Sequence, residues 1–263
     1  MAYEYEKILV DIDGQNATVT LNQPDIHNAF NDQLISELTD CFNKLGQEPN
    51  VRGIVLTGAG KSFCAGADLN WMKSMVNYSK EENMRDSMEL AGMFEAIYRC
   101  PKPVIARVNG HAFGGGLGLL ACCDYVISVP EAILSFSEVN LGIAPAVISP
   151  YILKRVAPTH ARYLFISGDR LDPARAKDYG LVDEIVEPDA LDEVVAKKLK
   201  IFSSSGPLAV AKNKELVENV TSMGWDEAKK YTIELIAELR TSEEGQEGLG
   251  AFLEKIKPSW RNQ

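Results

Sequence analysis

Two glycine-bearing segments, each after an apolar run, hold the residues best suited to chemistry. SFCAGADL covers residues 62–69 after GIVLTG, and NGHAFGGGLG covers residues 109–118 after VIARV. Glycines in the first turn of a helix leave the backbone N–H groups unobstructed, and the helix dipole gives these groups partial positive charge. Two such donors from separate loops, converging on one oxygen, would stabilise an enolate, each lowering the barrier by about 3 to 4 kcal/mol. The alternative is that the glycines serve close packing of helix and strand.

A single carboxylate, Glu138, stands in the apolar segment FSEVNLG. Apolar surroundings raise the pKa of a carboxyl group, which favours proton exchange near neutral pH. Taken alone, such a residue more often caps a helix or pairs locally. Glu138 is therefore a candidate proton carrier whose role depends on what surrounds it.

The elements that must position these segments alternate between strands and helices. KILVDID and NATVTLN alternate apolar and polar residues around Asp13-Gly14, which predicts a hairpin. Helical spacing follows at Leu34, Ile35, Leu38, Phe42 and Leu45. Ser79 and Glu82 form a capping box for a helix towards Tyr98. Residues 103–129 then predict a strand, a helix and a second strand.

The last third of the chain changes character. The strand LVDEIV closes the alternating part, and from about Leu191 the pattern is mostly helical, with breaks at Gly206-Pro207 and Gly224. We therefore expect an α/β core over residues 1–190, which carries the site, and a helical region over residues 191–263.

Composition limits the classes of partner. The net charge of -10 argues against nucleic-acid or anionic-membrane surfaces, because both need clustered Lys and Arg. The five cysteines are odd in number and form no CxxC pair, so we expect reduced thiols that pack in the core. MAYEYEKI lacks a signal-peptide apolar run, and no apolar stretch reaches membrane-spanning length. These features predict a cytoplasmic protein.

The sequence lacks the motifs of several familiar enzyme classes, because the required residues are absent or wrongly spaced. GAGKS lacks the first glycine of a P-loop, since Val55 stands there, and GxGxxG, HExxH and GxSxG are absent from the sequence. The three histidines are too scattered for a local metal motif, and we expect surface or packing roles and no metal. Nucleotide hydrolases, metalloenzymes and serine hydrolases therefore lose support.

The segments AGADL, PVIARVNGHAFGGGLGL, ACCDYVI, FSEVNLGIAP and GLVDEIV, in this order, resemble the crotonase (enoyl-CoA hydratase/isomerase) superfamily over nearly the whole chain. The resemblance implies a spiral of ββα units and a helical C-terminal trimerisation region, giving homotrimers or hexamers made of two trimers. It also implies an acyl-CoA thioester substrate, with no cofactor beyond the coenzyme A of the substrate.

The resemblance also assigns site residues. The oxyanion hole falls on the backbone N–H groups of Ala67 and Gly115, and Glu138 becomes the catalytic carboxylate. Residues that would line the CoA nucleotide are Ile26, His27, Ala29, Ala65, Gly66, Asp68 and Leu69. Phe252 and Lys255 resemble positions that reach CoA from a neighbouring subunit, although a solvated helix face explains them equally well.

One position departs from the two-glutamate hydratases of the superfamily. Gly118 stands where they carry a second glutamate, so one carboxylate must serve either hydration of a 2-enoyl thioester or double-bond migration in a 3-enoyl thioester. SEVNLGIAPAVISPYI with GGGLGLLACCD is similar to a bacterial branch, the methylglutaconyl-CoA and carboxygeranoyl-CoA hydratases, which act on branched, carboxylated substrates. Hydration is the preferred reading; a non-catalytic acyl-CoA binder is the third hypothesis.

The assignment carries expectations for glycine variants. Gly118→Ala should be tolerated or slightly stabilising if the local backbone is helical, because alanine costs less than glycine inside a helix. Gly115→Val should obstruct the thioester carbonyl, and Gly114→Ala should be milder.

Overall fold

Residues 3–261 are described by the computed structural model, in which two β-sheets carry the fold. The larger sheet has the strand order β1-β2-β3-β5-β7-β10, with β1 and β2 as the predicted antiparallel hairpin and the remaining pairs parallel. Its strands are β1 (Ile8–Asp13), β2 (Asn16–Leu21), β3 (Gly53–Gly58), β5 (Val104–Val108), β7 (Tyr125–Ser128) and β10 (Glu184–Ile185). LVDEIV thus contributes only a two-residue strand.

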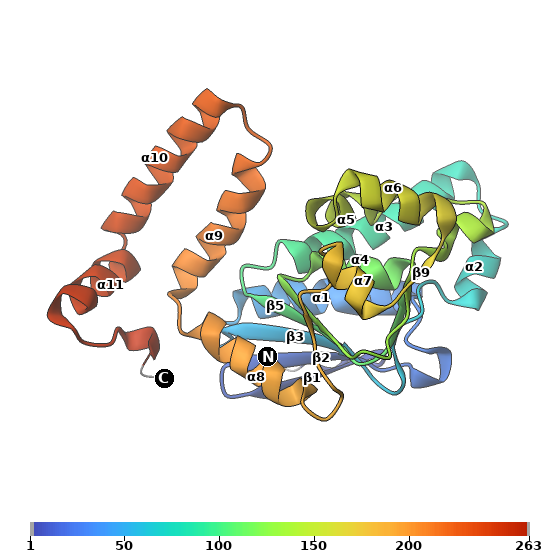
Figure 1. Ribbon diagram of the computed structural model, residues 1–263, viewed down its shortest axis with the longest axis horizontal. Coiled ribbons are helices and arrows are strands. Elements are labelled where there is room, and N and C mark those ends of the chain that lie inside the picture. Colours follow the sequence, from blue (N-terminus) through green and yellow to red (C-terminus); the bar gives the residue numbers. More distant parts are fainter. Residues whose placement is uncertain (1–2, 262–263) are drawn as a thin grey trace.

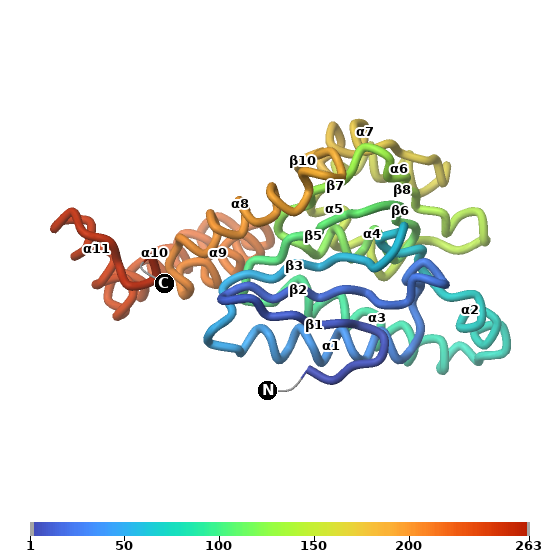
Figure 2. Tube along the Cα trace, turned by 90° about the horizontal axis from the view of Figure 1, so that it is seen from below, coloured from blue at the N-terminus to red at the C-terminus, as the bar shows by residue number. Residues whose placement is uncertain are grey.

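In the smaller sheet, as in the larger one, neighbouring strands follow one another in the order of the sequence. The smaller sheet consists of β4 (Ser62–Cys64), β6 (His111–Phe113), β8 (Leu134–Ser135) and β9 (Arg170–Leu171). β4, β6 and β8 follow β3, β5 and β7 respectively, and a helix comes after each pair. The chain therefore forms successive ββα units whose strands alternate between the two sheets (Figure 2), as the resemblance predicted.

The remaining elements connect and cover the sheets. They are η1 (Pro24–Ile26), α1 (Asp32–Gln47), α2 (Leu69–Met75), α3 (Lys80–Tyr98), α4 (Gly115–Cys122), η2 (Ser137–Leu141), α5 (Ser149–Arg155), α6 (Pro158–Ser167), α7 (Pro173–Asp178), α8 (Leu191–Ser203), α9 (Pro207–Val220), α10 (Trp225–Thr241), α11 (Glu243–Glu254) and η3 (Ser259–Arg261). The predicted capping box at Ser79 and Glu82 is confirmed at the start of α3.

Helices cover both faces of the larger sheet. Every residue of β3 is buried, which is typical of a parallel strand covered on two sides. α3 and α4 lie on one side of the sheet and α8 on the other (Figure 1). α8 packs on β3, β5 and β7 and buries Leu191, Val195 and Leu199 in the main core. The helices that leave the core thus begin at α9, after the predicted division at residue 190, because α8 completes the cover of the sheet.

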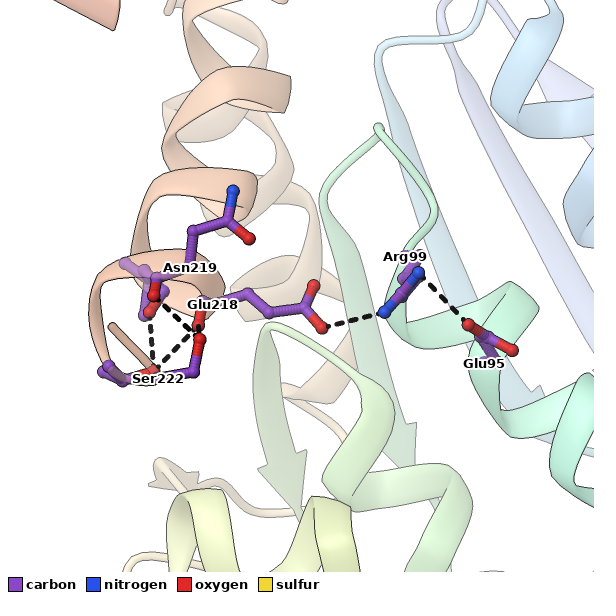
Figure 3. A network of polar contacts seen from close by, with 7 residues as sticks. Glu95, Arg99, Glu218, Asn219 and Ser222 are labelled. Carbon is purple, nitrogen blue, oxygen red and sulfur yellow. Dashed lines mark hydrogen bonds and ion pairs between the residues drawn. The ribbon is translucent and has the colours of Figure 1, made fainter. Parts of the chain in front are cut away.

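We call α9, α10 and α11 the C-terminal arm; it projects from one end of the sheets (Figure 1). α9 buries no residue, and polar contacts join it to the core. Lys214 Nζ lies 2.7 Å from an Asp124 oxygen, and Arg99 bridges Glu95 on α3 and Glu218 on α9 at 3.2 and 3.3 Å (Figure 3). Between arm and core lies an open groove of about 710 Å³.

The cysteines and histidines take structural places. All five cysteines are buried as free thiols, as expected. His111 Nδ1 accepts a hydrogen bond from the Ile133 N–H, and the ring of His160 packs against that of Tyr179. Over residues 3–261, no helix is both long enough and apolar enough to cross a membrane.

Candidate active site

The first glycine segment runs beside the chain that precedes α1. Phe30 and Ala67 form a parallel bridge, in which the Phe30 N–H donates to Gly66 O at 2.6 Å and the Asp68 N–H donates to Phe30 O at 2.8 Å. In a parallel bridge the residue between those two partners turns its own N–H to the opposite side. The Ala67 N–H therefore points away from Phe30, and Ala67 itself is exposed.

The second glycine segment lies against the first. A Cβ built on Gly66 would stand 2.9 Å from Phe113 O and 3.7 Å from the Gly115 nitrogen, so the two loops touch backbone to backbone. Gly115 is the first residue of α4, where no intrahelical acceptor exists for its N–H. Within residues 3–261, neither the Ala67 N–H nor the Gly115 N–H donates a backbone hydrogen bond. Two unpaired donors from neighbouring loops are the components of an oxyanion hole.

The conformation at Gly114 and the direction faced by Gly115 correct two sequence-based expectations. Gly114 has φ 51° and ψ -122°, a region that only glycine adopts readily, so Gly114→Ala will not be mild. A Cβ on Gly115 would point at the ring of Phe30, 2.7 Å from Cε2. Gly115→Val would thus first displace Phe30 and reach the oxyanion position only indirectly.

Glu138 lies over the start of α4. It belongs to η2, which ends at Gly142 in the left-handed conformation, and its Oε1 would stand 3.1 Å from a Cβ on Gly114. Its Oε2 is buried and has no hydrogen-bond partner among the described residues. Desolvation raises the pKa of this carboxyl group above its ordinary value, against a smaller lowering by a backbone hydrogen bond. A desolvated carboxylate whose Oε2 has no partner among the described residues, and which lies against the residue before Gly115, is suited to exchange a proton with a bound molecule.

The segments predicted to line CoA lie side by side. The Ala65 N–H donates to His27 O at 2.9 Å, and His27 Nδ1 lies 3.0 Å from Ser62 Oγ. Ile26 is exposed while Ala29 is buried. Of the other predicted residues, Asp68 caps α2 by accepting from the N–H groups of Asn70 and Trp71, and Leu69 is exposed.

Asn28 lies inside the first of these segments, and the sequence did not predict the role of its side chain. It has a left-handed backbone and is fully buried. Its Nδ2 lies 2.9 Å from the carbonyl oxygens of Ala59 and Ser62 and 3.2 Å from that of Phe63. Its Oδ1 accepts from the Gln23 N–H at 2.9 Å. The one indication in the sequence was a polar residue between His27 and the apolar pair Ala29-Phe30.

Gly118 is placed in the core by the structure, which corrects the expectation that alanine is tolerated there. The residue is buried on α4, and a Cβ would clash with Ile148 Cγ2 and lie 2.8 Å from Phe94 Cε1. These two apolar side chains occupy the direction in which a second glutamate would have to extend. The environment of Gly118 is therefore apolar packing.

The sequence pattern of the enoyl-CoA hydratase/isomerase family matches residues 12–263. The chain belongs to this family. Its relatives include a crotonyl-CoA hydratase of Syntrophomonas wolfei, 32% identical over 97% of this chain and 98% of that protein, and an (E)-benzylidenesuccinyl-CoA hydratase of Thauera aromatica, 29% identical over 97% and 98%. The crystal structure of an enoyl-CoA hydratase from Shewanella pealeana superposes with a TM-score of 0.94 at 35% identity, over 98% and 97% of the two chains.

As an enoyl-CoA hydratase/isomerase family member, the chain has a spiral ββα fold that brings Ala67, Gly115 and Glu138 together. It does not bring Phe252 and Lys255 to them. Both residues lie at the end of α11, and the arm extends away from α2 and α4 (Figure 1). Phe252 is 81% exposed, and Lys255 has a left-handed backbone with φ 58°. Within one chain these two residues cannot contribute to the site.

Proposed function

We propose that this protein is an enoyl-CoA hydratase that adds water across the 2,3 double bond of a 2-enoyl-CoA thioester. Glu138 accepts a proton from water as the water oxygen bonds to the β-carbon. The π electrons move to the α-carbon and the thioester oxygen, and this enolate is held by the N–H groups of Ala67 and Gly115. Return of the proton to the α-carbon then gives the 3-hydroxyacyl thioester.

The observation that carries this proposal is that Glu138 and two unpaired N–H groups lie on neighbouring loops. The buried Oε2 of Glu138 has no partner in the described part of the chain, and Gly114, beside its other oxygen, immediately precedes the donor Gly115. A substrate that offers a developing oxyanion and a transferable proton would satisfy all of these groups at once. The hydratase names of the relatives support the choice of reaction.

A double-bond isomerase is the second candidate, and the packing around Gly118 favours it. Phe94 and Ile148 leave no room beside Gly118 for a second carboxylate in this backbone. An isomerase needs only one carboxylate: Glu138 would remove the α-proton of a 3-enoyl thioester and return it to the γ-carbon. In hydration, by contrast, Glu138 alone would have to orient the water, accept its proton and return that proton to the α-carbon.

The substrate we propose is a branched or carboxylated enoyl thioester. The resemblance of residues 137–152 and 114–124 to hydratases of such substrates supports this choice, as does the name of the Thauera relative. Ile26, His27, Ala29, Ala65, Gly66, Asp68 and Leu69 would line the CoA nucleotide. Phe252 and Lys255 would complete a neighbour's site in a trimer or a hexamer. CoA enters with the substrate, and the chemistry needs no separate cofactor.

The five buried, unpaired thiols support a reducing compartment, and we propose the cytoplasm. Scaffolding without catalysis is the remaining hypothesis. It predicts that acyl-CoA binds without turnover, so the following assay would then detect no product.

Crotonyl-CoA, 3-methylglutaconyl-CoA and a 3-enoyl-CoA should be compared side by side, with products identified by mass. We expect hydration of at least one 2-enoyl substrate, and a rate loss of at least about 10² in Glu138→Gln with folding intact. Glu131→Gln is the matched control, because Glu131 is an exposed carboxylate ahead of β8. Near wild-type turnover by Glu138→Gln would require another base, and migration without hydration would identify the isomerase.

A further inference from the structure

The turn that ends α6 lies directly against the turn that carries Glu138. α6 ends at Gly168, whose φ of 61° is left-handed, and a Cβ there would stand 3.0 Å from both Val139 Cγ1 and Asn140 Nδ2. Val139 and Asn140 are the two residues after Glu138 in η2. Any side chain at position 168 would therefore press on the Val139 and Asn140 side chains, which belong to the turn that holds the carboxylate.

Ser135 joins this turn to the oxyanion loop. Ser135 is buried, with 3% of its surface exposed, and its Oγ donates a hydrogen bond to Gly168 O at 3.0 Å. The carbonyl of the same residue accepts from the Gly114 N–H at 2.9 Å. Ser135 is also the last residue of β8, two residues before η2 begins. One buried residue thus touches the end of α6 and the loop that presents the Gly115 N–H.

An aromatic contact fixes the same pair of elements. The rings of Phe136 and Phe165 meet edge to face with centroids 5.0 Å apart, and Phe136 is fully buried. Phe165 lies on α6, three residues before Gly168. α6 therefore contacts the Glu138 segment both before and after the carboxylate, at Phe136 and at Val139.

We infer that Gly168 and Ser135 are positioning residues, which set the distance between the Glu138 carboxylate and the oxyanion donor at Gly115. Neither residue touches the reacting atoms. Gly168 allows η2 to approach the end of α6, and Ser135 ties that end to the Gly114 peptide. This inference rests on the proposed role of Glu138 as the base. Its consequence is that the rate depends on the α6 turn, since misplacement of a catalytic group by about 1 Å can cost up to 10²-fold in rate.

The test compares Gly168→Ala and Ser135→Ala with two controls. Gly14→Ala is matched for backbone strain, because Gly14 has φ 57° and a Cβ there would meet no atom within 4 Å. Glu138→Gln tests the base itself. The double variant Gly168→Ala/Val139→Ala removes the methyl groups that the new Cβ would strike.

We expect kcat of Gly168→Ala to fall roughly 10- to 100-fold with KM changed by less than about twofold. The acidic limb of kcat/KM should move to lower pH, because a displaced carboxylate gains water and loses its desolvation. Ser135→Ala should also lower kcat and shift the acidic limb of kcat/KM to lower pH, but each change should be smaller than in Gly168→Ala. The double variant should recover part of the rate lost in Gly168→Ala, compared with Val139→Ala, because the contact with Val139 Cγ1 is removed while that with Asn140 Nδ2 remains.

The inference is overturned if folded Gly168→Ala keeps wild-type kcat and pH profile, or if Gly14→Ala loses as much rate. If Gly168→Ala does not fold, Ser135→Ala decides by the same two readouts. An active Glu138→Gln would overturn the proposed base together with this inference. An inactive Glu138→Gln with unchanged Gly168 and Ser135 variants would overturn the inference alone.

Discussion

At the scale of single residues, Glu138 is held in a state that the folded protein alone does not stabilise. Its Oε2 is buried without a partner among residues 3–261, and desolvation raises the pKa of its carboxyl group. Leaving a buried polar group unpaired costs free energy, which the surrounding packing must offset. The unpaired carboxylate oxygen is also reactive, because a bound water or an α-proton of the substrate offers the missing hydrogen-bond partner.

The first prediction is that Glu138→Gln is more stable than the wild type above the raised pKa. A carboxyl group whose pKa is raised in the native state binds protons more tightly folded than unfolded, so its stabilising effect is present at low pH and is lost as pH rises through the native pKa. The difference in unfolding free energy between variant and wild type should thus be largest near neutral pH and shrink below the ordinary carboxyl range. Urea unfolding at a series of pH values measures it; a difference that does not change with pH would contradict the raised pKa.

The second prediction is that Gly118→Ala destabilises the fold. The added methyl group would clash with Ile148 and press on Phe94, and overpacking of a dense core costs about 1 to 3 kcal/mol. Thermal unfolding should show a lower Tm, and Gly118→Ala/Ile148→Ala should recover part of the loss compared with Ile148→Ala. Gly250→Ala on α11 is the control, because no atom lies within 4 Å of a Cβ there. A Tm unchanged in Gly118→Ala would mean that Ile148 yields freely.

At the scale of elements, short loops align the site, and Asn28 joins them. The segment before α1, the end of β3 and the start of β4 meet at its amide group, through the carbonyls of Ala59, Ser62 and Phe63. Phe30, two residues on, then bridges to Ala67. The position of Ala67 therefore depends on the hydrogen bonds of Asn28 as well as on its own bridge to Phe30.

The third prediction is that Asn28→Ala destabilises the protein by about 2 to 4 kcal/mol, through unpaired buried carbonyls and a left-handed backbone unsuited to alanine. KM for the CoA thioester should rise with it. Asn28→Gly keeps the backbone conformation and removes only the side-chain bonds, so the difference between the variants isolates the strain. Urea unfolding and steady-state kinetics give both values. Equal behaviour of Asn28→Ala and wild type would show that the amide contacts contribute nothing net.

The elements differ in how far the sequence predicted them. The hairpin at Gly14, the capping box at Ser79 and the helix breaks at Gly206 and Gly224 follow from local patterns, and the structure has them. The smaller sheet has no such pattern, because its strands are two or three residues long. The packing of Phe94 and Ile148 around Gly118 is equally hidden, since it joins residues 24 and 30 positions away. Local chemistry predicted the elements, and long-range packing decided which substitutions they tolerate.

At the scale of the whole molecule, the C-terminal arm leaves several large apolar side chains exposed to solvent. Trp225, Phe252 and Leu253 are 85%, 81% and 78% exposed, and α9 buries no residue. Large exposed apolar side chains grouped on one region are a feature of surfaces that contact other proteins. Ion pairs at Lys214 and Arg99 join the arm to the core through α9, and Figure 3 shows the pair between Arg99 and Glu218. We therefore propose that these side chains contact another chain in the proposed trimer.

The fourth prediction is that Phe252→Asp/Leu253→Asp turns the assembled protein into monomers at micromolar concentration. Charges placed in an apolar contact lose hydration without gaining a partner, whereas on a free monomer both aspartates remain in water. The core should stay folded, with unchanged circular dichroism, because neither side chain packs within its own chain. If the arm completes a neighbour's CoA site, KM should rise at least about tenfold as the subunits separate.

Leu9→Asp is the control for this pair, since Leu9 is an exposed apolar residue on β1, outside the arm, at 53% exposure. Lys255→Ala separates assembly from binding: it should keep the assembled mass and raise KM alone. Analytical ultracentrifugation gives the mass, and kinetics at the same concentration give KM. A wild type that sediments as a monomer would contradict assembly through the arm. So would a double variant that keeps the wild-type mass, because the apolar surface at Phe252 and Leu253 would then lie outside every subunit contact.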